Sequence, residues 1–166
     1  MVKRKTMQDL SILVQQLITA QVECVLVGGY AAIVHGVSLV TQDVDFCCRF
    51  SEENLLRLQS AVADLHPVHR LTPQKLPLNL APGQCGNLKN LYLRTDLGIL
   101  DCISEVLGIG GYDQVFQDSQ PLQLSNGVCQ VLNIDSLIRA KEAMNRRHDR
   151  ITADLLRAIK ERSQKN

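Results

Sequence analysis

The stretch from Val25 to Phe46, VLVGGYAAIVHGVSLVTQDVDF, constrains the fold more than any other part of the chain. An apolar, β-branched run over 24–27 predicts a buried strand that ends at Gly28 and Gly29, and a short helix is expected over 30–35. Because glycine lacks a Cβ, a ligand can approach this backbone closely, and the N–H groups at a helix start suit an anion such as phosphate. A plain tight turn would explain the same pair of glycines.

Two carboxylates follow at the start of a second expected strand, residues 44–50. Side chains alternate along a strand, so Asp43 and Asp45 point to one face, whereas Val44 and Phe46 point to the core. Neighbouring carboxylates repel each other unless a cation lies between them or one of them stays protonated. Magnesium prefers oxygen ligands and would fit here, while two solvated acids at an exposed strand end are the alternative.

Asp101 lies inside the apolar run LGILDCIS, residues 97–104. A carboxylate in an apolar strand carries a large free-energy cost if it is buried without a partner. An arginine partner would remove that cost, and so would a role as third ligand in the site of Asp43 and Asp45. Three carboxylates on two neighbouring strands, beside a glycine turn, would place metal ions against a nucleoside triphosphate.

The rest of the pattern predicts an α/β (α+β) chain with a mixed β-sheet flanked by helices, and no regular βαβ alternation. We expect a core over 1–134 and a C-terminal helical extension over 135–166, packed on that core as one compact domain. Residues 66–90, with four prolines, are assigned no regular structure, and Gly110-Gly111 is assigned to a loop. The further expected elements are helices over 7–20 and 51–64, hairpins at Thr95-Asp96 and Asn126-Gly127, a helix capped by Asp135 that runs to 147, and a last helix to 162.

Composition excludes several classes of protein. The chain lacks an apolar run of about 18 residues, so no membrane span is expected, and the basic N-terminus lacks the apolar stretch of a secretory signal. A net charge of +1 and an aromatic content of 4% without tryptophan argue against a broad nucleic-acid surface or a base-stacking platform. The six cysteines form no CxxC pair and are expected to be reduced, mostly buried thiols, which favours a cytoplasmic protein.

Several polar residues have both a structural and a functional interpretation. His35 ends the short helix, where an imidazole suits the helix dipole or could contact a nucleotide. Thr41 could anchor the loop before the acidic strand through a side-chain hydrogen bond. The basic cluster near the last helices is either a solvated face or a site for triphosphate or RNA; it comprises Lys141, Arg146, Arg147, His148 and Arg150.

The combined pattern resembles the nucleotidyltransferase superfamily with the DNA polymerase β-type fold, and in detail its small bacterial AbiEii-type and minimal members. The C-terminal segment LIRAKEAMNRRHDR, residues 137–150, resembles the closing helix of that group, with Lys141 and Asp149 in matching places. The other residues that carry the resemblance are Gly28, Gly29, Ala31, His35, Gly36, Thr41, Asp43, Asp45 and Asp101.

This resemblance implies a metal-dependent enzyme that moves a nucleotide from an NTP to a hydroxyl acceptor and releases pyrophosphate. Asp43, Asp45 and Asp101 would be the catalytic residues and the ligands of Mg²⁺ or Mn²⁺, and Asp101 would also help to deprotonate the acceptor. The nucleotide-binding residues would be Gly28, Gly29, Thr41 and Lys141. The acceptor could be tRNA, a protein or a small molecule, and a protein partner or homo-oligomer could be involved.

The alternative is a catalytically weak or inactive module of the same fold that binds a nucleotide or a protein partner, as in a toxin–antitoxin pair. It is suggested by Leu39, which stands where many close relatives carry arginine, and by the small size of the chain. Gly29 also replaces a serine that many relatives carry. A metal-dependent phosphohydrolase is a weaker third hypothesis, because such enzymes usually add histidine ligands that are not well placed here.

Overall fold

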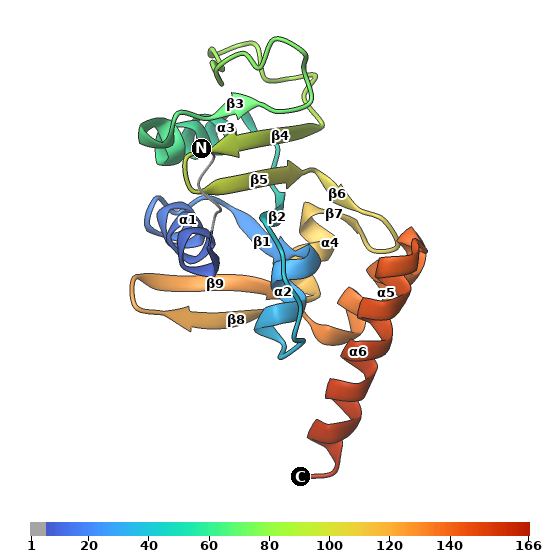
Figure 1. Ribbon diagram of the computed structural model, residues 1–166. Helices are drawn as coiled ribbons and strands as arrows, with labels where there is room; N and C mark the ends of the chain where they lie inside the picture. The colour runs from blue at the N-terminus through green and yellow to red at the C-terminus, as the bar shows by residue number, and fades with distance from the viewer. Residues whose placement is uncertain (1–5) are drawn as a thin grey trace.

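A seven-stranded mixed sheet with the strand order β3-β4-β5-β2-β1-β9-β8 forms the centre of the protein (Figure 1). The computed structural model describes residues 6–166, so the basic N-terminal residues 1–5 discussed above lie outside the described part. A separate two-stranded sheet pairs β6 with β7. The elements are α1 Met7–Thr19, β1 Cys24–Val27, α2 Gly28–Val34, β2 Asp43–Cys48, α3 Glu52–Val62, the 3₁₀ turn η1 Ala63–Leu65, β3 Val68–His69, β4 Asn90–Thr95, β5 Gly98–Ile103, β6 Glu105–Val106, β7 Gly110–Gly111, α4 Tyr112–Gln117, β8 Ser119–Leu124, β9 Gly127–Leu132, α5 Ile134–Met144 and α6 Arg147–Gln164.

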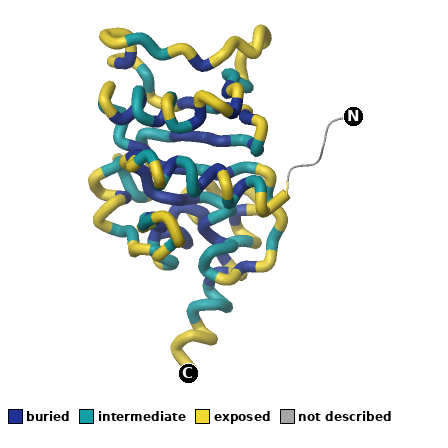
Figure 2. Tube along the Cα trace, turned by 90° about the vertical axis from the view of Figure 1, so that its left-hand side faces the viewer, coloured by how far each residue is buried: buried dark blue, intermediate teal, exposed yellow. Residues whose placement is uncertain are grey.

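The central strands of the sheet are the most buried part of the protein. All four residues of β1 are buried, which explains why this strand is a continuous apolar run. β1 pairs antiparallel with β2 and parallel with β9, and β2 pairs parallel with β5. Val44 and Phe46 are fully buried, as the alternation along this strand predicts. Figure 2 shows these buried strands between outer layers that are more exposed.

Helices cover the sheet with their apolar faces. α1 starts with a capping box formed by Thr6 and Asp9, and it buries Leu10, Leu13 and Leu17 at helical spacing. α5 and α6 pack against each other, and both contact α2. The C-terminal end of α6 extends away from the sheet and is exposed (Figures 1 and 2). The division into a core over 1–134 and an extension over 135–166 stays a prediction.

The structure confirms the mixed sheet and both predicted hairpins, and it corrects several boundaries. α5 is capped by Asn133, whose side chain accepts a hydrogen bond from Ser136 N at 2.8 Å, so Asp135 lies in the first turn and not at the cap. The short helix begins at Gly28, two residues earlier than predicted. Gly110 and Gly111, predicted as a loop, form a short strand, and α4 directly after them was missed because six residues show too little apolar periodicity.

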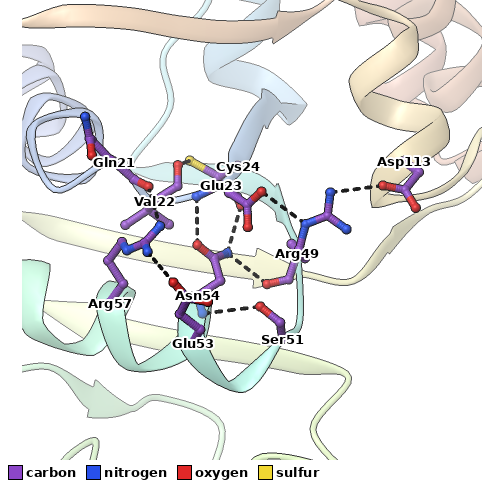
Figure 3. Close-up of polar contacts among 10 residues, drawn as sticks. All are labelled: Gln21, Val22, Glu23, Cys24, Arg49, Ser51, Glu53, Asn54, Arg57 and Asp113. Atoms are coloured by element: carbon purple, nitrogen blue, oxygen red, sulfur yellow. Dashed lines mark hydrogen bonds and ion pairs between the residues drawn. The ribbon is translucent and has the colours of Figure 1, made fainter.

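A buried asparagine joins α3 to the ends of β1 and β2 (Figure 3). The Asn54 amide donates to Glu23 O at 2.9 Å and Arg49 O at 2.8 Å, and its Oδ1 accepts from Glu23 N at 2.8 Å. Arg49 continues this network toward α4 through an ion pair with Asp113 and a contact with the Tyr112 ring, 4.6 Å from its centroid. Glu23 and Arg49 lie just outside the strands, and the Asn54 amide supplies hydrogen bonds to backbone groups there that are no longer part of the sheet.

The cysteines are free and buried, which confirms the expectation that they act as small apolar side chains. Among residues 6–166, no helix is both long and apolar enough to cross a membrane.

Candidate active site

Three carboxylates meet on one face of the sheet because of the register between β2 and β5. Asp45 stands directly opposite Asp101 in this parallel pair, and Asp43 lies two residues earlier on the same face. One carboxylate oxygen from each residue lies within 4.8 Å of the other two. The structure therefore brings together the three acidic residues that the sequence singled out.

Gly28 forms a wall of this acidic cluster. Its φ of +70° lies in the left-handed region, and a Cβ added there would stand 2.2 Å from Asp45 Oδ2. The neighbouring Gly29 has more room, since its Cβ would meet Thr41 Oγ1 at 3.6 Å. Position 28 must therefore be glycine for Asp45 to keep its place, whereas the packing around position 29 would accept a larger residue.

Thr41 fixes the first carboxylate. Its hydroxyl donates to Asp43 Oδ1 at 2.8 Å and lies 3.2 Å from Asp43 O. The contact with Asp43 O is the side-chain-to-backbone hydrogen bond that the sequence predicted. The bond to Asp43 Oδ1 was not predicted. This contact orients Asp43, and the nucleotide-binding role of Thr41 stays a prediction.

The cluster carries strong electrostatic repulsion. Burial raises the pKa of Asp45 to about 7, and the negative charges of Asp43 and Asp101 add to the rise. The positive charges of Lys141 and Arg70 oppose it without cancelling it. Three crowded oxygen donors, one of them with a raised pKa, form a set that fits a hard divalent cation such as Mg²⁺ or Mn²⁺.

Arg70 forms an ion pair with Asp101 that engages both carboxylate oxygens. Its Nε donates to Oδ1 at 3.0 Å and its terminal nitrogen to Oδ2 at 2.5 Å. Asp101 is only 6% exposed, and its carboxylate therefore needs a partner. The sequence left two partners open, an arginine or a metal shared with Asp43 and Asp45; the structure shows the arginine, and it also shows the cluster of three carboxylates. Sequence reasoning missed Arg70 because it lies in the proline-rich segment that was assigned no regular structure.

The backbone next to β3 holds Arg70 in place. Arg70 N donates to Tyr92 O at 3.0 Å, and the guanidinium lies over the Tyr92 ring, 5.5 Å from its centroid. Tyr92 in turn stands opposite Asp101 in the antiparallel pair of β4 and β5. Asp45 on β2, Asp101 on β5 and Tyr92 on β4 therefore stand side by side across three neighbouring strands.

The basic cluster near the last helices divides into parts with different roles. Asp149, fully buried, accepts hydrogen bonds from Arg146 Nε at 2.6 Å and from Lys141 Nζ at 3.4 Å. These two cations line the acidic site, whereas Arg150 bonds to Asn145 at the end of α5 and Arg147 is exposed. His148 lies 3.7 Å from Asp149.

His35 has a structural contact. Its Nε2 donates to Leu132 O at 2.8 Å and so joins the end of α2 to β9. The contact is structural, but it is a hydrogen bond to β9 and not the interaction with the helix dipole that the sequence suggested.

Two cavities meet at the carboxylates. One, of about 500 Å³, extends past Arg70 and Tyr92 toward the apolar side chains of Leu107 and Met144. The other, of about 520 Å³, lies between Gly29, His148 and the apolar face of α6 at Ile151 and Leu155. Asp43, Asp45, Lys141 and Arg146 line both cavities, so a group bound between the cavities would contact the acidic cluster and both cations.

Comparison with solved structures shows the fold of this chain. The lincosamide antibiotic adenylyltransferase LnuA, solved with lincomycin bound, aligns with a TM-score of 0.63 and 12% identity over 95% of this chain and 99% of its own. ANT(2″)-Ia, solved with adenylyl-2″-tobramycin, aligns with a TM-score of 0.47 and 12% identity over 92% and 98% of the two chains.

The protein has the nucleotidyltransferase fold, as the resemblance implied. No model of a known protein family matches the sequence, and a search of curated proteins also gives no match.

Proposed function

We propose that this protein is a metal-dependent nucleotidyltransferase that moves a nucleotide from an NTP to a hydroxyl acceptor and releases pyrophosphate. The observation that carries the proposal is the convergence of Asp43, Asp45 and Asp101 within 4.8 Å, in a protein with the nucleotidyltransferase fold. Asp43, Asp45 and Asp101 would hold Mg²⁺ or Mn²⁺. The metal would supply charge neutralisation at the phosphates and activation of the attacking hydroxyl.

The cavity between Gly29 and α6 is our candidate for the nucleotide. Lys141 and Arg146 supply positive charge at its inner end, next to the carboxylates, where the triphosphate would lie. Ile151 and Leu155 supply apolar surface at its outer end, where a base could pack. The backbone at Gly28 and Gly29 and the hydroxyl of Thr41 would lie beside the phosphates, as the resemblance implies.

The cavity past Arg70 is then the place for the acceptor. A volume of about 500 Å³ suits a small molecule. Its outer part carries the exposed apolar side chains of Leu107 and Met144 and the carboxylate of Glu105, and it offers no row of cations for a nucleic-acid backbone. We therefore favour a small, partly apolar hydroxyl compound over tRNA.

In this arrangement the chain would position the reactants and neutralise charge, which accounts for most of the catalysis of phosphoryl-type transfer. Asp101, on the acceptor side, would take the proton of the attacking hydroxyl. Lys141 and Arg146 would bind the negative charge of the triphosphate and then of the leaving pyrophosphate.

Transfer of label from an α-³²P-labelled NTP, with Mg²⁺ or Mn²⁺, tests the proposal. The acceptor panel should contain lincomycin, because LnuA is a lincosamide adenylyltransferase, together with an aminoglycoside, tRNA and the protein itself. We expect labelled product and pyrophosphate that disappear in Asp43→Asn but persist in Asp154→Asn, a control on the exposed face of α6. Failure to bind any NTP in the presence of metal would refute the proposal.

The second candidate is a module that binds a nucleotide or a protein partner without turnover. The ion pair of Arg70 with Asp101 favours it, because a carboxylate held by arginine at both oxygens is a poorer base and ligand than a free one. NTP binding without pyrophosphate release, combined with a tight complex with another protein, would support this candidate. Turnover by the isolated chain would exclude it.

A further inference from the structure

The Arg70–Asp101 pair stands at the boundary between the acidic cluster and the acceptor cavity. Both oxygens of Asp101 are engaged by the guanidinium, and within residues 6–166 no other cation lies at ion-pair distance from this carboxylate. The Arg70 side chain is 24% exposed and lines the acceptor cavity, so it has space into which it can move.

A divalent cation bound by Asp101 would sit close to this guanidinium. Two positive groups on one carboxylate repel each other, and the low exposure of Asp101 leaves little water to screen them. Arginine also loses its fork-like, two-bond geometry if one carboxylate oxygen turns to a metal. A metal ion can therefore use Asp101 fully only if Arg70 weakens or leaves its ion pair.

We propose that Arg70 is a positioning residue that competes with metal for Asp101 and keeps the metal affinity of the empty site low. This inference rests on the proposed function, since it concerns the same acidic site. In the absence of substrates Arg70 is the counter-ion of Asp101. When Arg70 leaves this pair, the acceptor cavity that it lines gives its guanidinium room to move.

Titration with Mn²⁺ alone, followed by electron paramagnetic resonance or calorimetry without nucleotide or acceptor, tests this competition. We expect Arg70→Gln to bind Mn²⁺ more tightly than the wild type by about tenfold or more, because Asp101 becomes free. Arg70→Lys should also bind more tightly, by a smaller factor, because it keeps the charge but loses the two-bond geometry. The matched control is Arg94→Gln, an exposed arginine on the neighbouring strand, which should bind as the wild type does.

Measuring Arg70→Gln in a protein that also carries Asp101→Asn tests whether Arg70 acts on Mn²⁺ binding through Asp101. Arg70→Gln should give little or no gain in Mn²⁺ affinity when combined with Asp101→Asn, whereas an equal gain would mean a general effect of charge and overturn the proposal. Equal or weaker Mn²⁺ binding by Arg70→Gln would overturn it too, because Arg70 would then support Asp101 as a ligand. The shift in melting temperature caused by Mn²⁺ should be larger in Arg70→Gln than in the wild type.

The same titration separates this inference from the proposed function. If Asp43→Asn binds Mn²⁺ as the wild type does, the metal site itself fails, and the proposed function fails with it. If Asp43→Asn loses Mn²⁺ binding but both Arg70 variants bind as the wild type does, only the competition by Arg70 is refuted.

Discussion

Replacing Gly28 by alanine should disable the acidic site while leaving the fold largely intact. The added Cβ would stand 2.2 Å from Asp45 Oδ2, so the carboxylate must move by most of an ångström to reach an acceptable contact. A misplacement of about 1 Å in a catalytic group can cost on the order of 100-fold in rate. The left-handed φ of +70° adds a strain of about 1–2 kcal/mol for any residue with a Cβ.

The matched control is Gly29→Ala, one residue further on. Its Cβ would meet no protein atom closer than 3.6 Å, so Mn²⁺ affinity and stability should stay near those of the wild type. Gly29→Ser should be tolerated for the same reason. The measurements are nucleotide transfer, Mn²⁺ affinity and urea unfolding of all three variants.

We expect Gly28→Ala to lose about 100-fold in transfer rate and to bind Mn²⁺ more weakly, with a loss of unfolding free energy of about 2 kcal/mol. Wild-type Mn²⁺ affinity in Gly28→Ala would refute the reasoning, because it would mean that Asp45 need not stay where the structure places it.

Three further predictions concern stability. Because the pKa of Asp45 is raised to about 7, from about 3.9 in an unfolded chain, the stability linked to its protonated form is fully present below pH 4 and is lost as the pH rises through 7. Thermal unfolding of the metal-free protein should therefore show a gain from Asp45→Asn that grows between about pH 4 and about pH 7 and then levels off; a gain independent of pH would contradict this. Asp149→Asn should lower the unfolding free energy by about 3 kcal/mol, because it leaves the buried Lys141 without its anion. The exposed control Asp154→Asn should lower it by less than about 1 kcal/mol. Equal losses of the two variants in urea titrations would mean that the buried pair of Lys141 and Asp149 adds no stability beyond that of an exposed pair. Asn54→Ala should cost about 2–4 kcal/mol, since it removes the three hydrogen bonds by which a buried amide holds the backbone of Glu23 and Arg49, and a loss below 1 kcal/mol would show that water replaces these bonds.

The part of the site that could be predicted from the sequence depends on local rules. Alternation along a strand places Asp43 and Asp45 on one face, and the cost of an unpaired buried charge marks Asp101 as a residue that needs a partner. That the two strands are neighbours was inferred from the need of Asp101 for a partner, whereas their parallel register, which sets Asp45 opposite Asp101, is known only from the structure.

Arg70 and Asn54 could not be predicted, because their roles depend on contacts between distant segments. Arg70 reaches Asp101 from 31 residues away, and its segment has no periodicity that would place it beside the sheet. Asn54 looks like an ordinary polar residue in the first turn of a helix, yet it bonds to Glu23, also 31 residues away. β8 contains Pro121, which a strand at the edge of a sheet tolerates.

The position of Asp101 within β5 also determines where the chain can change in length. Deleting one residue between Gly98 and Asp101 would turn the carboxylate to the opposite face, among the fully buried Leu100 and Cys102, and empty its place beside Asp45. The loop before β4 is different, because a Cβ added at Gly83 or Gly86 would meet nothing within 4 Å. A peptide tag inserted near these two glycines should leave the protein functional, whereas the shortest deletion inside β5 should remove its chemistry.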